Sequence, residues 1–429
     1  MEVGGILVLI GSFFLLMFLN VPIAFSLGIS SVITVWYLDL PTIIIFQKML
    51  SGLQSFTFLA VPFFIMVGLI MGEGGISTKL IRFSNLLIGR IRGGLAMINV
   101  LVSMLFGGIS GSSVADVSSI GTILIPMMKE KGYDDDYSVA VTVTSSIQGV
   151  IIPPSQNMIY YSLAAGGVSV GKLFMAGYIP GILFGISLMI LTYFLAIKRG
   201  YPKEQSIPLN QSGKIVLDAL LGLTTVVIII GGIVFGVFTA TESAAIAVVY
   251  VFFLTTIIYR SLNFKKFVKI LKETISTLSV IIAVIATSSA FGWLLAYLNV
   301  PQLVMNLLMN ISPNRAVALL IINLFLLIIG MFMDMGIAIL LVTPILLPVV
   351  TELGMDPIQF GIVLIIGLGI GLVTPPVGTS LFVGSSIAGI KLEDTVKILI
   401  PFYLVMLAVL MLVTYWPDLV MFLPNLIFK

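Results

Sequence analysis

Residues 107–116 read Gly-Gly-Ile-Ser-Gly-Ser-Ser-Val-Ala-Asp, and residues 152–155 then interrupt the next apolar segment with Ile-Pro-Pro-Ser. The second half of the chain repeats this arrangement at residues 330–336, Gly-Met-Phe-Met-Asp-Met-Gly, and 374–379, Thr-Pro-Pro-Val-Gly-Thr. The same interval separates four pairs of residues: Pro126 and Pro348, Gly132 and Gly354, Asp134 and Asp356, and Pro153 and Pro375. Paired interruptions in two hydrophobic halves are typical of secondary transporters that bind substrate near the middle of the membrane.

The composition places the chain in a membrane. Hydrophobic residues make up 59% of it and charged residues 9%, whereas a soluble domain carries about 25% charged residues. We therefore expect an all-α polytopic membrane protein. Cysteine and histidine are both absent, which excludes thiol and imidazole chemistry and the usual zinc sites. The net charge of +3 is small and suggests no nucleic-acid partner. The first apolar run lacks the features of a signal peptide, so we expect a mature helix there.

The apolar segments give about ten predicted crossings, because a helix needs roughly 20 apolar residues to cross a bilayer core. They are 3–19, 21–38, 57–74, 137–166, 172–198, 214–238, 240–260, 274–297, 357–387 and 393–415.

Two further apolar regions, 93–130 and 315–352, are each broken near the middle. Residues 93–107 would span only about 22 Å at 1.5 Å per residue, short of the ~30 Å core. We expect each region to be a re-entrant hairpin that turns at 107–111 or 330–336. The alternative is a pair of ordinary crossings with a tight turn.

The distribution of basic residues predicts the orientation. With the crossings above, all but four of the 21 Lys and Arg residues fall on one side, which is therefore expected to be cytoplasmic, with both termini outside. The exceptions are Lys48, Lys172, Arg315 and Lys429. An odd number of crossings separates the two hairpins, so the repeats are expected to be inverted. If either hairpin were instead a pair of full crossings, the segments that follow it would stay on the same sides of the membrane.

Amphipathic segments lie beside the hairpins. Residues 77–92 and 263–276 alternate apolar and basic residues at helical spacing, which predicts helices along the cytoplasmic surface. Residues 41–53 form a weaker counterpart on the outside.

The four interruptions contain Gly, Ser, Pro, Asn and Thr, which leave carbonyl, hydroxyl and amide oxygens free. Such neutral oxygens suit a hard cation such as Na⁺. The alternative is that the hydroxyls only satisfy the backbone or help helices to pack. The helices that restart after each break direct their N-termini to the same region, where they could hold a substrate carboxylate. The candidate oxygen ligands are Ser110, Ser112, Ser113, Gly149, Asn157, Thr374, Gly378 and Thr379.

Three acidic residues fall inside the predicted membrane segments, where an acid is functional by default. Asp116 and Asp334 could set the charge near a cation, pair within the core, or relay protons. Glu242 follows Thr239-Ala240-Thr241, and a helix-capping role is favoured for it. No nucleophile–base pair is evident, so no enzymatic activity is expected.

Taken together, these residues resemble the large membrane subunit of tripartite ATP-independent periplasmic (TRAP) transporters over essentially the whole chain. The most specific segments are 107–116, Ile152-Pro153-Pro154-Ser155, 236–245 and Val373-Thr374-Pro375-Pro376-Val377-Gly378. The family more usually has Thr-Pro-Thr-Glu where this chain has Thr239-Ala240-Thr241-Glu242. That departure touches no expected ligand.

The resemblance implies an elevator-type carrier driven by a Na⁺ gradient, in the bacterial inner membrane. It implies two protein partners: a small four-helix membrane subunit and a periplasmic substrate-binding protein. Within the lipid bilayer, scaffold helices and an arm would occupy 1–92 and 199–314. The transport-domain repeats would be 93–198, with broken helix 137–166, and 315–429, with broken helix 357–387.

The resemblance also implies ligands and a substrate. One Na⁺ site would use Ser110, Ser112, Ser113, Gly149, Pro153 and Asn157, and the other Asp334, Gly336, Thr374, Gly378 and Thr379. Substrate would lie between the tips, against Ser112, Ser113, Asp116, Asn157, Met335 and Thr379. No other cofactor is expected. An organic acid anion is implied, with sialic acid the first choice. A four-carbon dicarboxylate and a stand-alone Na⁺-coupled anion carrier are the alternatives.

Overall fold

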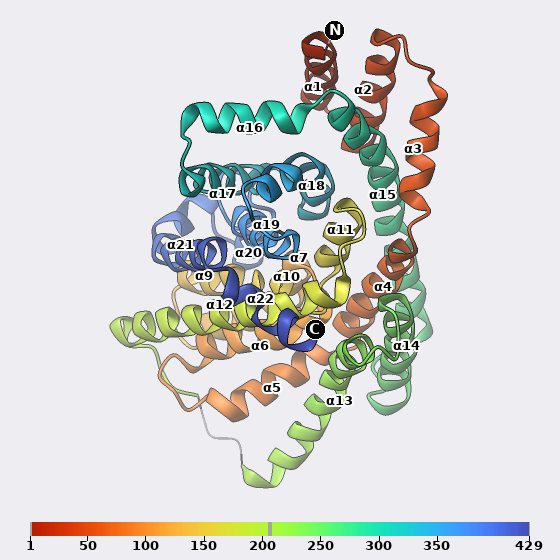
Figure 1. Ribbon diagram of the computed structural model, residues 1–429. Coiled ribbons are helices and arrows are strands. Elements are labelled where there is room, and N and C mark those ends of the chain that lie inside the picture. Colours follow the sequence, from red (N-terminus) through yellow and green to blue (C-terminus); the bar gives the residue numbers. More distant parts are fainter. Residues whose placement is uncertain (1, 205–207, 429) are drawn as a thin grey trace.

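The computed structural model describes residues 2–204 and 208–428, so the predicted outside residue Lys429 lies beyond it. Within those ranges all regular structure is helical (Figure 1). The first half contains α1 (Glu2–Phe18), α2 (Ile23–Tyr37), α3 (Ile43–Leu53), α4 (Ala60–Glu73), α5 (Ile76–Ile88), α6 (Gly94–Ser110), α7 (Ser113–Asp116), a π-helical turn (Val117–Gly121), α8 (Thr122–Glu130), α9 (Asp135–Ser146), α10 (Gln148–Ile151), α11 (Gln156–Ala164) and α12 (Val170–Arg199).

The second half is built of a related but not identical series of elements. They are α13 (Leu209–Val234), α14 (Ala240–Phe253), a π-helical turn (Leu254–Ile258), α15 (Phe264–Tyr297), α16 (Val300–Ile311), α17 (Arg315–Phe332), α18 (Met335–Glu352), α19 (Pro357–Gly371), α20 (Thr379–Ala388), α21 (Leu392–Tyr415) and α22 (Pro417–Ile427).

The structure shows how far the repeat extends. Three pairs of helices, α7 with α18, α9 with α19 and α12 with α21, begin at the same interval that separates Pro153 from Pro375. Both of those prolines precede a second proline through a cis peptide bond. The flanking helices follow the same order, since α5 and α16 each begin after a left-handed residue, Gly75 and Asn299. The repeat therefore includes the helices outside the hairpins as well.

Each hairpin turns at a residue pair that the structure defines. The first turns at Gly111 and Ser112, at the end of the expected segment 107–111. Gly111 has φ +61°, in the left-handed region that glycine adopts without a Cβ penalty. Gly107 lies within α6, where the absence of a side chain lets α6 pack closely against α10: a Cβ there would lie 2.4 Å from the Gly149 Cα atom. The second hairpin turns at Met333 and Asp334, within the expected segment.

The predicted broken helices are both discontinuous. In the first, residues 152–155 separate α10 from α11. In the second, residues 372–378 separate α19 from α20. The proline pairs account for the interruptions, because proline supplies no backbone N–H and disfavours a helical residue before it.

In Figure 1, the hairpins and broken helices form one body, while α1–α4 and α13–α15 form a flank beside it. Two short helices, α5 and α16, link that flank to α6 and to α17. The expectation for 77–92 is thus matched by α5. The expectation of a separate surface helix at 263–276 is wrong, because those residues are the first turns of the continuous helix α15. The helix α16 was not predicted.

The apolar residues form two cores. The larger one runs through the repeats and continues into α4, α5, α13 and α14. A smaller core joins α1, α2, α3 and the end of α15, with Leu9, Leu27, Ile45 and Leu294 fully or almost fully buried. Within the described ranges, eight helices are long and apolar enough to cross a membrane. Six of these coincide with predicted crossings, and the other two are α17 and α18, the helices of the second hairpin. The remaining four of the ten predicted crossings are α1 and α2, which have 17 and 15 residues, and the two broken helices.

Candidate functional site

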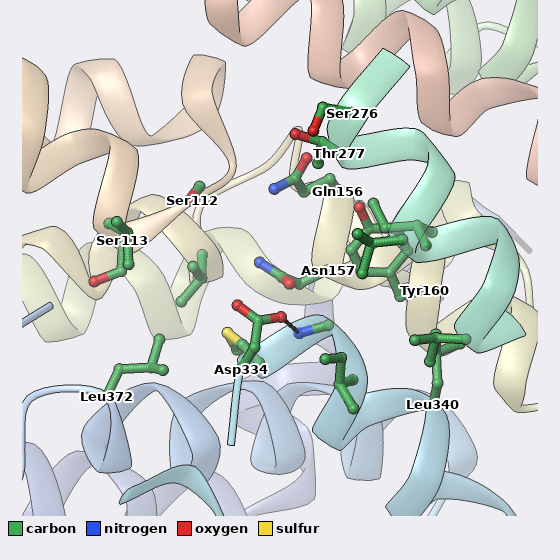
Figure 2. A pocket seen from close by; sticks show the side chains of 18 residues that line it. Ser112, Ser113, Gln156, Asn157, Tyr160, Ser276, Thr277, Asp334, Leu340 and Leu372 are labelled. Atoms are coloured by element: carbon green, nitrogen blue, oxygen red, sulfur yellow. Dashed lines mark hydrogen bonds between the residues drawn. The ribbon is translucent and has the colours of Figure 1, made fainter. Parts of the chain in front are cut away.

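The two hairpin tips meet at one cavity of about 550 Å³, which both polar and apolar side chains line (Figure 2). The first tip contributes Ser112 and Ser113, and the second contributes Asp334, Met335 and Gly336. The remaining wall comes from α15 on the flank and from residues beside the two helix breaks. The other described lining residues are Val114, Val150, Gln156, Asn157, Tyr160, Ser276, Thr277, Val280, Ile281, Val284, Ile337, Leu340 and Leu372.

The two tips end in related caps. The Ser112 side chain accepts a hydrogen bond from the Ala115 N–H group at 3.3 Å, and Asp334 Oδ1 accepts one from the Gly336 N–H group at 3.0 Å (Figure 2). Ser112 and Asp334 are equivalent positions of the repeat. Each side chain satisfies a backbone donor at the start of the second hairpin helix. Asp334 remains exposed to the cavity.

Ser113 connects the repeats. Its hydroxyl lies 2.6 Å from the Ser146 hydroxyl on α9 and 2.7 Å from the Ser380 hydroxyl on α20. All three side chains are buried. The first tip is thereby fixed to a broken helix of each half.

The first predicted sodium cluster is brought together. The Asn157 side-chain amide donates to the Gly111 carbonyl at 2.8 Å. A Cβ on Gly149 would lie 3.8 Å from the Ser110 hydroxyl, and one on Gly108 would lie 2.7 Å from the Pro153 carbonyl oxygen. The hydroxyl and carbonyl groups at the tip and the break therefore face one another.

Asp116 lies behind this cluster and does not line the cavity, so the geometry does not support the expected contact with substrate. Its side chain is 1% exposed, and neither carboxylate oxygen has a hydrogen-bond partner among the described residues. The Ser103 hydroxyl faces it but lies 3.2 Å from the Ser145 hydroxyl. A Cβ on Gly149 would lie 3.9 Å from the Asp116 Cβ atom. A buried carboxylate without a partner is costly unless a cation or proton compensates it.

Two groups of the second predicted cluster form hydrogen bonds within the protein. The Gly378 N–H group donates to the Met331 carbonyl at 3.3 Å, and the Thr374 hydroxyl donates to the Ile370 carbonyl at 2.7 Å. The Thr379 hydroxyl is buried with no partner among the described residues. Thr379 does not line the cavity, whereas Met335 does.

Glu242 belongs to a cap, as the sequence favours. Thr239 and Glu242 form a capping box at the start of α14, with Glu242 Oε2 accepting from the Thr239 N–H group at 2.8 Å. Neither residue lines the cavity.

Four polar cavity residues were missed by the sequence reasoning. Gln156 and Tyr160 lie on α11, beside predicted positions, and their spacing on one helix face could have indicated them. Ser276 and Thr277 lie inside α15, where no break or charge marks them. Gln156 and Thr277 also line a second cavity of about 620 Å³ that extends to Glu73 and Glu273.

Two repeats, each with a hairpin tip and an interrupted helix beside one shared cavity, are typical of a membrane carrier of the secondary-transporter class. Comparison with known proteins specifies the family. Residues 10–419 match the family model "Tripartite ATP-independent periplasmic transporter, DctM component". The chain belongs to this family and is a multi-pass bacterial inner-membrane transporter component, not an enzyme.

Relatives match over nearly their full length. YgiK of Salmonella typhimurium, described as uncharacterized, is 44% identical over 98% of this chain and 97% of its own. The sialic acid TRAP transporter large permease SiaM of Vibrio cholerae is 39% identical over 96% of each chain. The C4-dicarboxylate TRAP transporter large permease DctM of Pseudomonas aeruginosa is 38% identical over 93% of this chain and 94% of its own.

A solved structure shares the fold. The crystal structure of the YdaH transporter of Alcanivorax borkumensis superimposes with a TM-score of 0.65, covering 87% of this chain and 88% of its own at 13% identity.

Proposed function

We propose that this chain imports an organic acid anion, sialic acid in the first instance, together with Na⁺. In this proposal a periplasmic binding protein delivers the anion, and a small four-helix membrane subunit completes the carrier. The observation that carries the proposal is the cavity between the hairpin tips, with oxygen clusters directly behind both tips.

Sodium coupling is supported most strongly at the first cluster. Asp116 supplies a buried carboxyl group with no hydrogen-bond donor among the described residues, near the Ser110 hydroxyl and the Gly149 backbone. Carboxylate, hydroxyl and carbonyl oxygens are the ligands that hard cations prefer. We therefore assign Asp116 to the cation, in place of the substrate. The Thr379 hydroxyl and the free Asp334 oxygen are the corresponding candidates at the second cluster.

An anionic substrate would be held without a basic side chain, since none of the described lining residues is Lys or Arg. The first turns of α11 and α18 border the cavity through Gln156, Asn157, Met335 and Gly336. Free N–H groups and the helix dipole favour a carboxylate at such ends. Bound Na⁺ would add positive charge only when it is present, which couples the two ligands.

The proposed mode of movement follows from α5 and α16, the two helices that link the flank to the body. The flank would act as a scaffold, and the body of hairpins and broken helices would slide against it while α5 and α16 serve as arms. The charge distribution places both termini on the periplasmic side in this proposal.

A reconstituted uptake experiment tests the proposal. Proteoliposomes holding this chain and its small subunit would take up labelled sialic acid only with an inward Na⁺ gradient and the cognate binding protein. Uptake with Na⁺ but without the binding protein would instead identify a stand-alone carrier.

Labelled succinate is the matched second substrate, because the dicarboxylate relative is almost as similar to this chain as the sialic acid relative. Preference for succinate would contradict the sialic acid assignment and leave the Na⁺-coupled carrier intact. Uptake of either anion at equal rates with and without Na⁺ would contradict the coupling.

A further inference from the structure

Two hydroxyl groups on α15 differ from the others on that helix. Thr274, Ser279, Thr287, Ser288 and Ser289 each donate their side-chain hydroxyl to a carbonyl of the preceding turn, at 2.7 to 3.2 Å. Ser276 and Thr277 make no such bond to any described residue. Because a hydroxyl inside an apolar helix normally bonds back to its own backbone, these two are available to a ligand.

Their position explains the difference. Ser276 and Thr277 face the cavity opposite the hairpin tips, next to Gln156 (Figure 2). The rest of the α15 wall is apolar, with Val280, Ile281 and Val284. The hydroxyl pair, which we call the α15 step, is thus the polar part of the wall that the flank presents to the site.

The charge of the cavity restricts what the α15 step can bind. None of the described lining residues is basic, and the one ionisable carboxylate that lines it, Asp334, is acidic. A substrate whose first carboxylate lies at the helix N-termini would extend its other end toward α15. A second carboxylate there would meet neutral hydroxyls and no basic side chain among the described lining residues. A chain of hydroxyl groups would instead find the donors and acceptors of Ser276, Thr277 and Gln156.

We propose that the α15 step is a specificity determinant that binds the hydroxylated end of a sugar acid and disfavours a dicarboxylate. This inference rests on the proposed function, because it needs an organic acid anion in the cavity. The step belongs to the flank, whereas the oxygen clusters belong to the body. The two sets of groups therefore affect different quantities: the step affects substrate affinity and selectivity, and the clusters affect Na⁺ affinity.

The test is a pair of variants in the reconstituted carrier with its small subunit and binding protein. Ser276→Ala combined with Thr277→Val removes both hydroxyls at nearly constant shape. Ser279→Ala is the matched control, because Ser279 is an exposed hydroxyl on the same helix that bonds to the Ile275 carbonyl at 2.7 Å. Uptake of labelled sialic acid is measured against sialic acid and Na⁺ concentration, with succinate as competitor.

We expect the double variant to raise the half-saturating concentration of sialic acid about tenfold, the effect of two lost hydrogen bonds of ordinary strength. The half-saturating Na⁺ concentration should stay unchanged, and inhibition by succinate should become relatively stronger. An equal effect in Ser279→Ala, or no change in sialic acid affinity, would overturn the inference. Na⁺-coupled uptake of succinate alone by the unaltered carrier would also overturn it, while uptake without Na⁺ dependence would count against the proposed function itself.

A labelling experiment provides a readout that does not depend on transport rate. The chain has no cysteine, so Ser276→Cys and Ser279→Cys each introduce a single thiol. Sialic acid should slow the reaction of Ser276→Cys with a thiol reagent in the assembled complex and leave Ser279→Cys unaffected. Equal protection of both positions, or of neither, would contradict direct contact at the step.

Discussion

Asp116 is the residue whose substitution tests the energetics of the site most directly. Its carboxylate is buried without a hydrogen-bond donor among the described residues. We predict that Asp116→Asn abolishes most of the rise in melting temperature that Na⁺ gives the unaltered protein, because a ligand stabilises only through its affinity for the folded state. Without Na⁺ the variant should melt at the same or a higher temperature, since a neutral amide removes an uncompensated buried charge.

The control for Asp116 is Asp218→Asn. Asp218 pairs with Lys79 at 3.1 Å on a partly exposed surface and lies outside both oxygen clusters. Its variant should keep the full Na⁺-dependent shift. A Na⁺ response retained by Asp116→Asn would show that this carboxylate is not a cation ligand.

At this same scale, the sequence was a good guide to groups at chain breaks and a poor guide elsewhere. Ser110, Ser112, Ser113 and Asn157 were predicted because glycine and proline mark the places where the backbone opens. The place of Asp116 behind the first cluster depends on packing between α6 and α10. Ser276 and Thr277 were not predicted, because an uninterrupted helix gives no local sign of which face meets a cavity.

Among the elements, the first hairpin depends on a backbone-to-backbone contact. A Cβ on Gly107 would lie 2.4 Å from the Gly149 Cα atom, and the backbone cannot move aside cheaply. We predict that Gly107→Ala lowers stability by about 1–3 kcal/mol, as overpacking does in a dense interior. Thermal melting of the purified protein measures the effect.

Gly11→Ala is the comparison, because Gly11 lies on α1, where an added Cβ would have no neighbouring atom within 4 Å. It should be neutral or slightly stabilising, since alanine is the better helix former. If the two variants melt alike, the α6–α10 contact is looser than the structure indicates.

The hairpins and broken helices were predictable as elements, since two matching interruptions define each repeat. Their exact turns were not, because a glycine can serve either a turn, as Gly111 does, or close packing, as Gly107 does. The expected surface helix at 263–276 was wrong for a related reason: its basic residues lie on the first turns of a helix that then continues. Lys269, for example, pairs with Glu73 at 2.6 Å.

For the whole molecule, the proposed sliding of the body against the flank can be tested with a disulfide. A Cβ on Gly72 in α4 would lie 3.4 Å from the Ser119 hydroxyl in the first hairpin, close enough for a cysteine pair to bridge. We predict that oxidised Gly72→Cys with Ser119→Cys takes up no substrate and that reduction restores uptake. No other cysteine in the chain competes for the bond.

The matched cross-link joins two helices of the flank. A Cβ on Gly52 in α3 would fall against the Ser289 hydroxyl in α15, so a disulfide between Gly52→Cys and Ser289→Cys stays within the flank. This second disulfide should leave transport intact. Full activity of the oxidised first pair would argue against an elevator movement.

One of the differences between the two halves bears on which face the empty carrier opens to. In the first repeat the chain breaks at Gln54 and Ser55 between α3 and α4, whereas its counterpart in the second repeat is the unbroken helix α15. Identical halves exchanging conformations would make the two end states mirror each other and share one free energy. Because the first half has a break between α3 and α4 where the second half has one continuous helix, the two end states no longer have the same free energy. In the proposed alternating mechanism, the unloaded carrier therefore spends more time open to one side of the membrane than to the other.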